Sequence, residues 1–171
     1  MALKFAGAGL VMVSAIMWGL YMASKEIFRL KDLREMKRAL DILASEIEYA
    51  MNQLDEAAMN ISSKCAEPVK GIFENFSRNI NILNNVGQAW SQAVESCAES
   101  SYFNPPDLDM MSDFSKTLGY LDKNMQINSI SMQLDYINSQ IDKLEGSWEK
   151  SRKMYLSLGS LGGILIVVLL I

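Results

Sequence analysis

The sequence has no histidine, and this absence excludes several kinds of enzyme site. Histidine is the commonest general base and the commonest metal ligand, so a Ser-His-Asp triad or a two-histidine zinc site cannot be built. A glycine-rich phosphate loop is also missing, because the densest glycine group, at 159–163, lies inside a long apolar run. Glu46 and Glu48 are two positions apart and would face different sides of a helix. We therefore predict a protein that is not an enzyme and that uses no metal or cofactor.

Cysteine is scarce as well. Cys65 and Cys97 are the only two, and they form neither a C-x-x-C pair nor a zinc-like spacing. In a cytoplasmic domain they are expected to be free thiols that pack as small buried apolar side chains. A disulfide between them is the alternative that a secreted chain would favour.

The central part of the chain has no excess of basic charge. Residues 25–153 carry 15 basic and 20 acidic side chains, a net charge of −5. Nucleic-acid binding calls for a basic face, so no nucleic acid is expected as a partner. No motif indicates a small-molecule substrate either.

Two long uncharged runs lie near the ends of the sequence. Residues 5–24 provide twenty uncharged positions and residues 154–171 provide eighteen, each about the length of a helix that crosses a bilayer. We predict transmembrane helices at 1–24 and 154–171 around a domain of residues 25–153. Basic residues directly follow the first run and directly precede the second, so the positive-inside rule places this domain in the cytoplasm.

The first run has an alternative interpretation as a cleaved secretory signal, which would make the chain a secreted helical protein. Its apolar length and the basic cluster behind it argue against that interpretation. Within both runs small residues recur at helical spacing, which favours close packing of helices in lipid. These residues are Ala15, Gly19, Ala23, Gly159 and Gly163.

The strongest periodic pattern is a helical seam. From Leu33 to Ile61, nine apolar residues alternate spacings of three and four, and no Pro or Gly lies between Gly19 and Pro68. This pattern predicts one continuous helix that leaves the first span and extends about 42 Å from Leu33 to Ile61. A second seam, from Ile127 to Trp148, leads back to the second span.

The two seams run in opposite directions along the chain, and each needs a partner to bury it. An antiparallel pair is the simplest solution. Between them, apolar faces predict about three shorter helices, around Ile72, over 86–97 and around Phe114, with an Asn-rich turn at 79–85 and a loop at 100–106 ahead of a cap at Asp107 or Asp109. We therefore predict an all-α, membrane-anchored antiparallel helical bundle with two long heptad helices, each continuous with a transmembrane span.

Several short motifs occur in a characteristic order: GLYMASK at 19–25, EIEY at 46–49, LGYLDKNMQ at 118–126 and KMYLSLGSLGGILIVVLLI at the C-terminus. Together with Pro68, Ala89 and Trp90 between them, the whole chain resembles the stage III sporulation protein AB family of endospore-forming bacteria. Gln53 departs from that family, which often has a proline at this position. The departure favours an unbroken helix.

The resemblance implies a membrane component of the channel apparatus that links the mother cell with the engulfed forespore. The soluble domain would be similar to the cytoplasmic domains of type II secretion and type IV pilus platform proteins. The implied partners are a cytoplasmic secretion-type ATPase, other membrane subunits of the channel and membrane lipid. The implied location is the mother-cell membrane around the forespore.

The predicted partner contacts are four residues that match or neighbour family positions and lie off the apolar seam, namely Arg34, Glu46, Glu48 and Tyr49. A purely structural role is the alternative for each of them. For the protein as a whole, the alternative is a static double-anchored scaffold that never contacts the ATPase.

Overall fold

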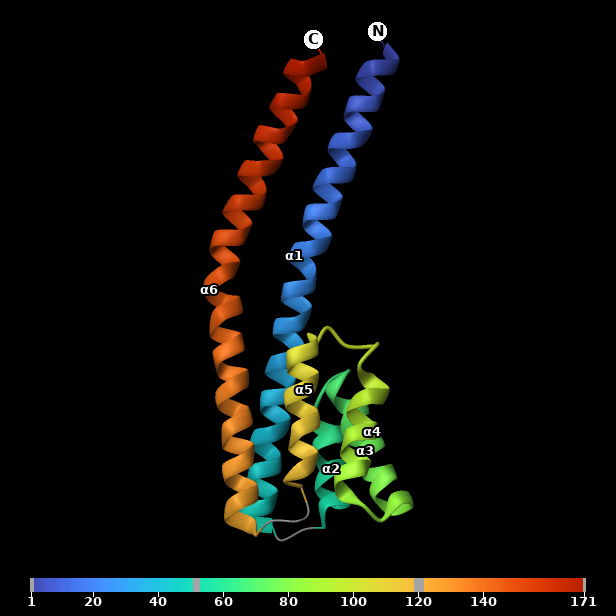
Figure 1. The fold of residues 1–171 in the computed structure, drawn as a ribbon, viewed down its shortest axis with the longest axis vertical. Coiled ribbons are helices and arrows are strands. Elements are labelled where there is room, and N and C mark those ends of the chain that lie inside the picture. Colours follow the sequence, from blue (N-terminus) through green and yellow to red (C-terminus); the bar gives the residue numbers. More distant parts are fainter. Residues whose placement is uncertain (1, 51–52, 119–121, 171) are drawn as a thin grey trace. The chain divides into compact units, whose positions relative to one another are not determined.

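A computed structural model describes the backbone of residues 2–50, 53–118 and 122–170, and it describes the side chains of 14, 17, 21, 24–49, 53–118 and 122–146. This described part contains six α-helices and two short helical segments and no strand, which confirms the predicted all-α class (Figure 1). The elements are α1 (Ala2–Ser45), the π-helix η1 (Glu46–Ala50), α2 (Leu54–Lys64), α3 (Val69–Leu83), α4 (Val86–Cys97), α5 (Pro105–Asp113), the 3-10 helix η2 (Phe114–Lys116) and α6 (Lys123–Leu170).

The chain divides into two units. One consists of Met1–Ile27 and Asp142–Ile171, and the other consists of Phe28–Ile141. Among the residues searched, no helix is both long and apolar enough to cross a membrane. The two predicted spans fall almost entirely on residues whose side chains lie outside the described set. Membrane anchoring and the predicted domain bounds therefore stay predictions.

Within Phe28–Ile141, the α1–η1 segment and α6 run antiparallel. Near one end, Arg29 Nη2 donates to Gln140 Oε1 at 3.2 Å, and near the other, Lys123 Nζ donates to the carbonyl oxygen of Glu48. An early residue of one helix thus meets a late residue of the other at both places. The predicted antiparallel pairing is confirmed, with both seams contributing buried side chains, namely Leu33, Met36, Leu40, Leu43, Ile130, Ile137 and Ile141.

The predicted continuous helix from Leu33 to Ile61 is wrong. The α-helix ends at Ser45, and Gln53, which precedes α2, has an extended backbone with φ −64° and ψ 147°. Asn60 Nδ2 then lies 2.5 Å from Glu46 Oε1. Fourteen positions along one straight helix would separate two residues by about 21 Å. The chain therefore turns back after η1, and α2 runs beside α1.

The seam misled the prediction because both helices bury one face in the same core. Leu43 of α1 and Ala57, Ala58 and Ile61 of α2 are all buried, so the spacing of three and four continues across the turn. An apolar spacing records which face is buried, but it does not record the direction in which the chain continues.

Gln53 provides a test of this turn. Its φ of −64° is the value that a proline ring imposes, so a proline at this position would fit the turn. We expect Gln53→Pro to stabilise the folded chain by about 0.4–1 kcal/mol, because proline restricts the unfolded state. Urea unfolding in detergent micelles, followed by circular dichroism, measures this effect.

The matched control is Ala57→Pro, one turn into α2. It removes the bond from the Ala57 N–H to the Gln53 carbonyl and is expected to destabilise by about 3 kcal/mol or more. A lower urea midpoint for Gln53→Pro than for the unaltered chain would contradict the turn.

In the described part of the chain, four α-helices, and not about three, connect α1 with α6. The additional helix is α2.

The Asn-rich turn is shorter than predicted, because α3 continues through Leu83 and only Asn84, with φ 50°, is left-handed. Asn85 then caps α4 by accepting the N–H of Gln88. The later loop ends at Asn104, which is the N-cap residue of α5. The predicted cap Asp107 lies three positions further on and completes the capping box by accepting the N–H of Asn104. Two prolines occupy the first turn of α5, where a missing N–H costs little.

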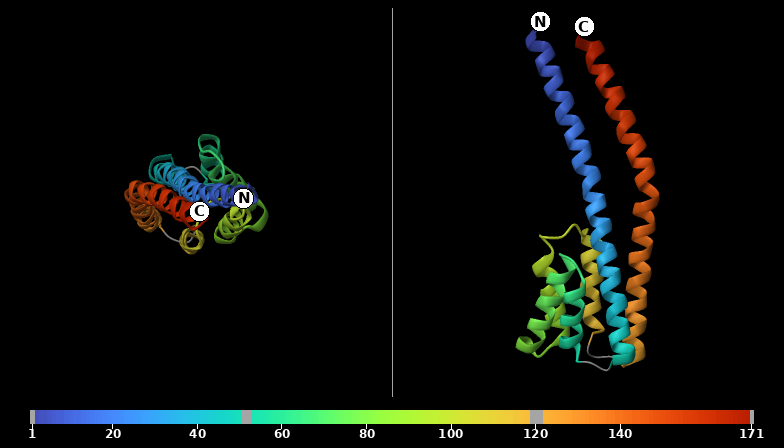
Figure 2. Two further views of the ribbon diagram at one scale, coloured as in Figure 1. Left: turned by 90° about the horizontal axis from the view of Figure 1, so that it is seen from above. Right: turned by 180° about the vertical axis from the view of Figure 1, so that it is seen from behind.

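The core of Phe28–Ile141 is centred on Trp90 of α4, which has no exposed surface. Three aromatic rings, Phe73, Phe76 and Phe114, meet it edge-on with centroids 5.4, 5.1 and 5.5 Å away. Its Nε1 donates to the carbonyl oxygen of Met111 at 2.6 Å. Helix α3 packs between α2 and α4, and α4 also contacts α5 and η2 (Figures 1 and 2).

Both cysteines are buried free thiols, as predicted. Burial raises the pKa of Cys65, and the nearby Glu35 carboxylate acts in the same direction against Arg38. A raised pKa keeps a thiol protonated and unreactive. Cys65 is therefore an unreactive core side chain.

Candidate functional site

Three of the four predicted partner contacts lie together in η1, at the end of α1. Tyr49 is 78% exposed and is therefore not a core residue, and Glu48 is exposed beside it. Glu46 is half-buried and accepts a hydrogen bond from Asn60. The Glu48 carbonyl binds the ammonium group of Lys123, so the start of α6 belongs to the same surface. We call Glu46, Glu48, Tyr49 and Lys123 the η1 surface.

Arg34 does not belong to the η1 surface. It is exposed on α1, twelve positions before Glu46, which corresponds to about 18 Å along a helix. The predicted packing residues of the spans, Ala15, Gly19, Ala23, Gly159 and Gly163, lie on helices, but their side-chain surroundings are outside the described residues.

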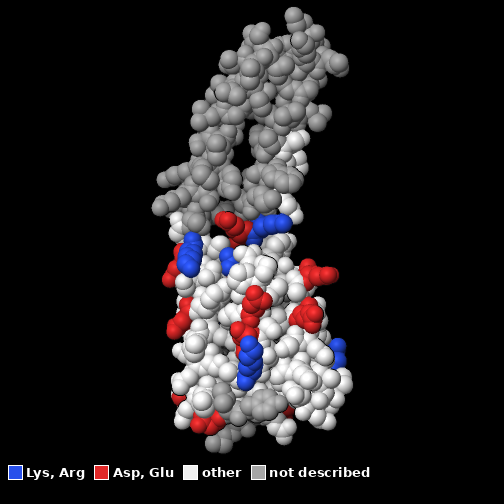
Figure 3. Space-filling view, viewed as in Figure 1, with Lys and Arg blue, Asp and Glu red and all other residues white. Residues whose placement is uncertain are grey.

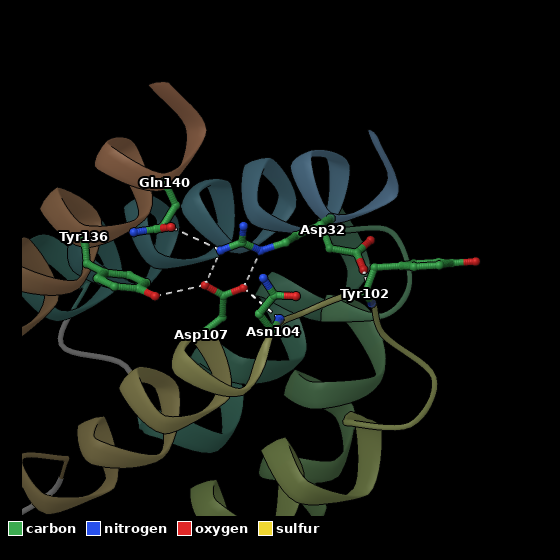
Figure 4. A network of polar contacts seen from close by, with 7 residues as sticks. Asp32, Tyr102, Asn104, Asp107, Tyr136 and Gln140 are labelled. Carbon is green, nitrogen blue, oxygen red and sulfur yellow. Dashed lines mark hydrogen bonds and ion pairs between the residues drawn. The ribbon is translucent and has the colours of Figure 1, made fainter. Parts of the chain in front are cut away.

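A second polar feature, absent from the sequence predictions, joins three helices around the carboxylate of Asp107 in α5. Arg29 of α1 binds it with two parallel bonds, Nε to Oδ2 and Nη2 to Oδ1, both 2.8 Å (Figure 4). Tyr136 of α6 donates its hydroxyl to Oδ1 at 3.0 Å, and the backbone N–H of Asn104 donates to Oδ2 at 2.9 Å. Gln140 of α6 accepts a further bond from Arg29 at 3.2 Å. We call these five residues the Asp107 network.

The Asp107 network is an ion pair removed from water. The Asp107 side chain is fully buried, and that of Arg29 is 12% exposed. Burial by itself would raise the pKa of Asp107, but the bonds from Arg29, the Asn104 N–H and Tyr136, together with the guanidinium charge, lower this pKa overall. Bidentate pairing of this kind is among the strongest polar contacts in proteins. It fastens α1, α5 and α6 to one another.

The loop before α5 is attached to α1 by a separate contact. Asp32 is 4% exposed, and its Oδ2 accepts the backbone N–H of Tyr102 at 2.8 Å. Burial raises the pKa of Asp32, although the Tyr102 bond and the charge of Lys31 lower it. The Tyr102 ring itself points away from the Asp107 network (Figure 4).

Sequence reasoning had little chance of finding the Asp107 network. The sequence predicts Asp107 only as a possible helix cap, and Arg29 belongs only to the basic cluster that follows the first uncharged run. The two residues are 78 positions apart, and their contact depends on how α1 and α5 pack. The only local signal was an acidic residue in the first turn of a helix that begins with two prolines.

Among the described side chains, no arrangement indicates a catalytic site. Among the residues searched, no group of three His, Cys, Asp or Glu could hold a metal ion. The Asp107 carboxylate has its acceptor positions engaged by Arg29, Tyr136 and Asn104. On the face drawn in Figure 3, acidic and basic side chains are interspersed over the described part of the chain.

The family of the chain follows from comparison with known proteins. A model of the family described as Stage III sporulation protein AB matches residues 4–171. The chain belongs to this family. The resemblance seen in the sequence motifs is therefore confirmed, and the protein is a sporulation protein for which no enzyme activity is indicated.

One curated protein and one solved structure are similar to this chain. The chain is similar to the Stage III sporulation protein AB of Bacillus subtilis (strain 168), with 28% identity over 169 residues that cover 98% of this chain and 99% of the relative. It is also similar to a solved structure of a Stage III sporulation protein AB, with a TM-score of 0.67, 24% identity and coverage of 71% of this chain and 97% of the solved one. The second likeness supports the fold alone.

In this member of the stage III sporulation protein AB family, the hydroxyl of Tyr136 makes the stability of the Asp107 network depend on pH in the alkaline range. Burial, the hydrogen bond to Asp107 and the negative charge of Asp107 raise the pKa of Tyr136 to about 12. Because the folded pKa exceeds the unfolded value of about 10, the stabilisation is complete below pH 10 and is lost as the pH rises toward 12.

We therefore expect unfolding free energy to fall more steeply between about pH 10 and 12 in the unaltered chain than in Tyr136→Phe. At pH 7 the variant should be less stable by about 1.5 kcal/mol, the lower value for a hydrogen bond to a charged group. Urea midpoints across the pH range measure both effects. If the unfolding free energies of the two proteins changed in parallel with pH, the pKa of the Tyr136 hydroxyl would be the same in the folded and unfolded states, which contradicts the prediction.

Proposed function

We propose that this member of the stage III sporulation protein AB family is a non-enzymatic membrane platform component of the channel apparatus between mother cell and forespore. In this proposal two transmembrane helices hold it in the mother-cell membrane around the forespore, and the central domain lies in the mother-cell cytoplasm. The two uncharged runs and their flanking basic residues support this location.

The observation that carries the proposal is the fastening of α1 to α6. These two helices contain the two uncharged runs, and Asp107 of α5 binds both Arg29 of α1 and Tyr136 of α6. The bidentate ion pair holds α5 to α1, and hydrogen bonds of Tyr136 and Gln140 hold α6 to the same two charged groups, so these contacts oppose sliding of the helices. A force applied to either helix would therefore act on both.

The partner proposed for the η1 surface is the cytoplasmic secretion-type ATPase. Tyr49 offers an exposed aromatic ring, the type of residue that is enriched in interface hot spots. Glu46 and Glu48 stand at the C-terminal end of α1–η1, where the helix dipole disfavours negative charge. A basic group on the partner would relieve that unfavourable arrangement. Because Lys123 is bound to Glu48, a protein seated here would contact α1–η1 and α6 together.

Photocrosslinking in sporulating cells tests the proposal. A photoreactive amino acid at Glu48 is expected to capture the ATPase, whereas the same group at Glu99 is not. Glu99 is also an exposed acidic residue, but it follows α4 in the loop region that binds α1 through Asp32, at the other end of the bundle. It is therefore a matched control for charge and exposure.

The alternative function, a static double-anchored scaffold, makes a different prediction for the same experiment. Capture of channel membrane subunits alone at Glu48, with no ATPase, would overturn the ATPase contact and favour the scaffold. Capture of the ATPase at both positions would show that the η1 surface is not the specific site.

A further inference from the structure

Tyr102, in the loop between α4 and α5, forms an aromatic pair with Phe28 of α1 that no part of the proposed function uses. Tyr102 stacks on Phe28 of α1 with ring centroids 4.8 Å apart and an interplanar angle of 24°. Each residue is 44% exposed. The pair is held in place because Asp32 accepts the Tyr102 N–H. Residues 100–106, which form the end of this loop and the two prolines that begin α5, contain no charged residue.

The position of Phe28 along α1 indicates what this pair meets. Phe28 follows Ser24, the last residue of the predicted span, by four positions, or about 6 Å of helix rise. The headgroup layer of a bilayer begins at the edge of the hydrocarbon core and is about 5–7 Å thick. Aromatic side chains are favoured in that layer. Two exposed lysines, Lys25 and Lys31, lie close to Phe28 in the sequence and suit phosphate groups there.

We propose that the stacked pair Phe28–Tyr102 lies in the headgroup layer of the membrane and anchors the α4–α5 loop to the bilayer surface. The inference rests on the proposed function, since it needs the first run to span the membrane. The contact is aromatic more than electrostatic, because the exposed acidic residues Glu26, Glu95 and Glu99 offset the two lysines. A half-exposed aromatic stack beside an uncharged segment suits a lipid interface, where each ring has an apolar face and Tyr102 a polar tip.

Site-directed spin labelling of the full chain tests this position. The chain would be reconstituted in vesicles of phosphatidylethanolamine and phosphatidylglycerol, with the buried Cys65 and Cys97 replaced by alanine. Labels are placed one at a time at Tyr102, at Ile82 and at Met17. Ile82 is a matched control, because it is 67% exposed and lies in the last turn of α3, at the other end of the bundle from the loop. Met17 lies within the first uncharged run.

Collision rates with oxygen, which enters lipid, and with a water-soluble nickel chelate report the surroundings of each label. We expect the label at 102 to show a higher ratio of oxygen to nickel collisions than the label at 82, and a lower ratio than the label at 17. A label at the exposed Ser100 repeats the measurement with the aromatic stack intact.

The possible results separate this inference from the proposed function. If position 17 is in lipid and both loop labels match position 82, the lipid contact of the loop is overturned while membrane anchoring stands. If position 17 is in water, both fail together. If the loop labels are shielded from both reagents, protein and not lipid covers the pair, and the lipid contact is again overturned.

Discussion

Arg29→Met is expected to destabilise the folded chain by about 3–5 kcal/mol, because it leaves the carboxylate of Asp107 buried without its cation. Methionine retains most of the arginine stem, so the packing of α1 changes little. Tyr136 and the Asn104 N–H still donate to Asp107, but neither carries a charge. The decrease in unfolding free energy therefore reports mainly the loss of the ion pair and only slightly the change in side-chain volume.

The pH dependence of this effect has a defined sign. In the unaltered chain the pKa of Asp107 is lowered, so its stabilisation is present above the unfolded pKa of about 3.9 and is lost as the pH falls through the folded pKa. Without Arg29, burial dominates and the pKa of Asp107 rises. The variant should then gain stability as the pH falls from neutral, so the difference between the two proteins narrows toward pH 4.

Urea unfolding in detergent micelles at several pH values measures the difference. The double variant Arg29→Met with Asp107→Leu should recover much of the loss, because an apolar pair can replace a buried ion pair. Lys116→Met is the matched control: its partner Asp113 is also on α5, but both side chains are at least 70% exposed, so it should change stability by less than about 0.5 kcal/mol. If Arg29→Met and Lys116→Met lowered the unfolding free energy equally, the Asp107 network would not have the proposed stabilising effect.

Trp90→Ala is expected to destabilise by about 3–5 kcal/mol, the usual cost of removing a buried tryptophan side chain. Trp90 has no exposed surface, and the rings of Phe73, Phe76 and Phe114 surround it. The substitution would leave a cavity where α3, α4 and η2 meet. Their backbones hold those rings apart, so the cavity cannot close fully.

Trp90→Phe separates the contribution of the ring volume to stability from the contribution of the hydrogen bond. It keeps an aromatic ring in the cluster but removes the donor to the Met111 carbonyl, so the expected loss is about 1–3 kcal/mol. Ile82→Ala serves as the control, because its side chain is large and 67% exposed, and the expected change is within about 0.5 kcal/mol. If Trp90→Ala unfolds at the same urea concentration as Ile82→Ala, Trp90 is not the centre of the core.

The residues of the η1 surface illustrate how far sequence reasoning reached. The spacing of Glu46, Glu48 and Tyr49 off the apolar seam correctly indicated exposed or half-exposed positions. It did not reveal that a π-helix and a turn follow Ser45, or that Lys123 joins the same surface from α6. The π-helix places these side chains at the end of the bundle, whereas a continuous rod would have placed them midway along it.

The sequence by itself determined the all-α class, the buried faces of α1 and α6, the bounds of α4 and the family resemblance. These features are local, because a helix satisfies its own hydrogen bonds and its apolar face repeats every three or four residues. Only the tertiary structure decided that the first seam folds back at Gln53, that Arg29 meets Asp107 and that Tyr102 stacks on Phe28. Each of these depends on segments far apart in the chain, whose meeting is set by the packing of the whole core and leaves no mark in the spacing of neighbouring residues.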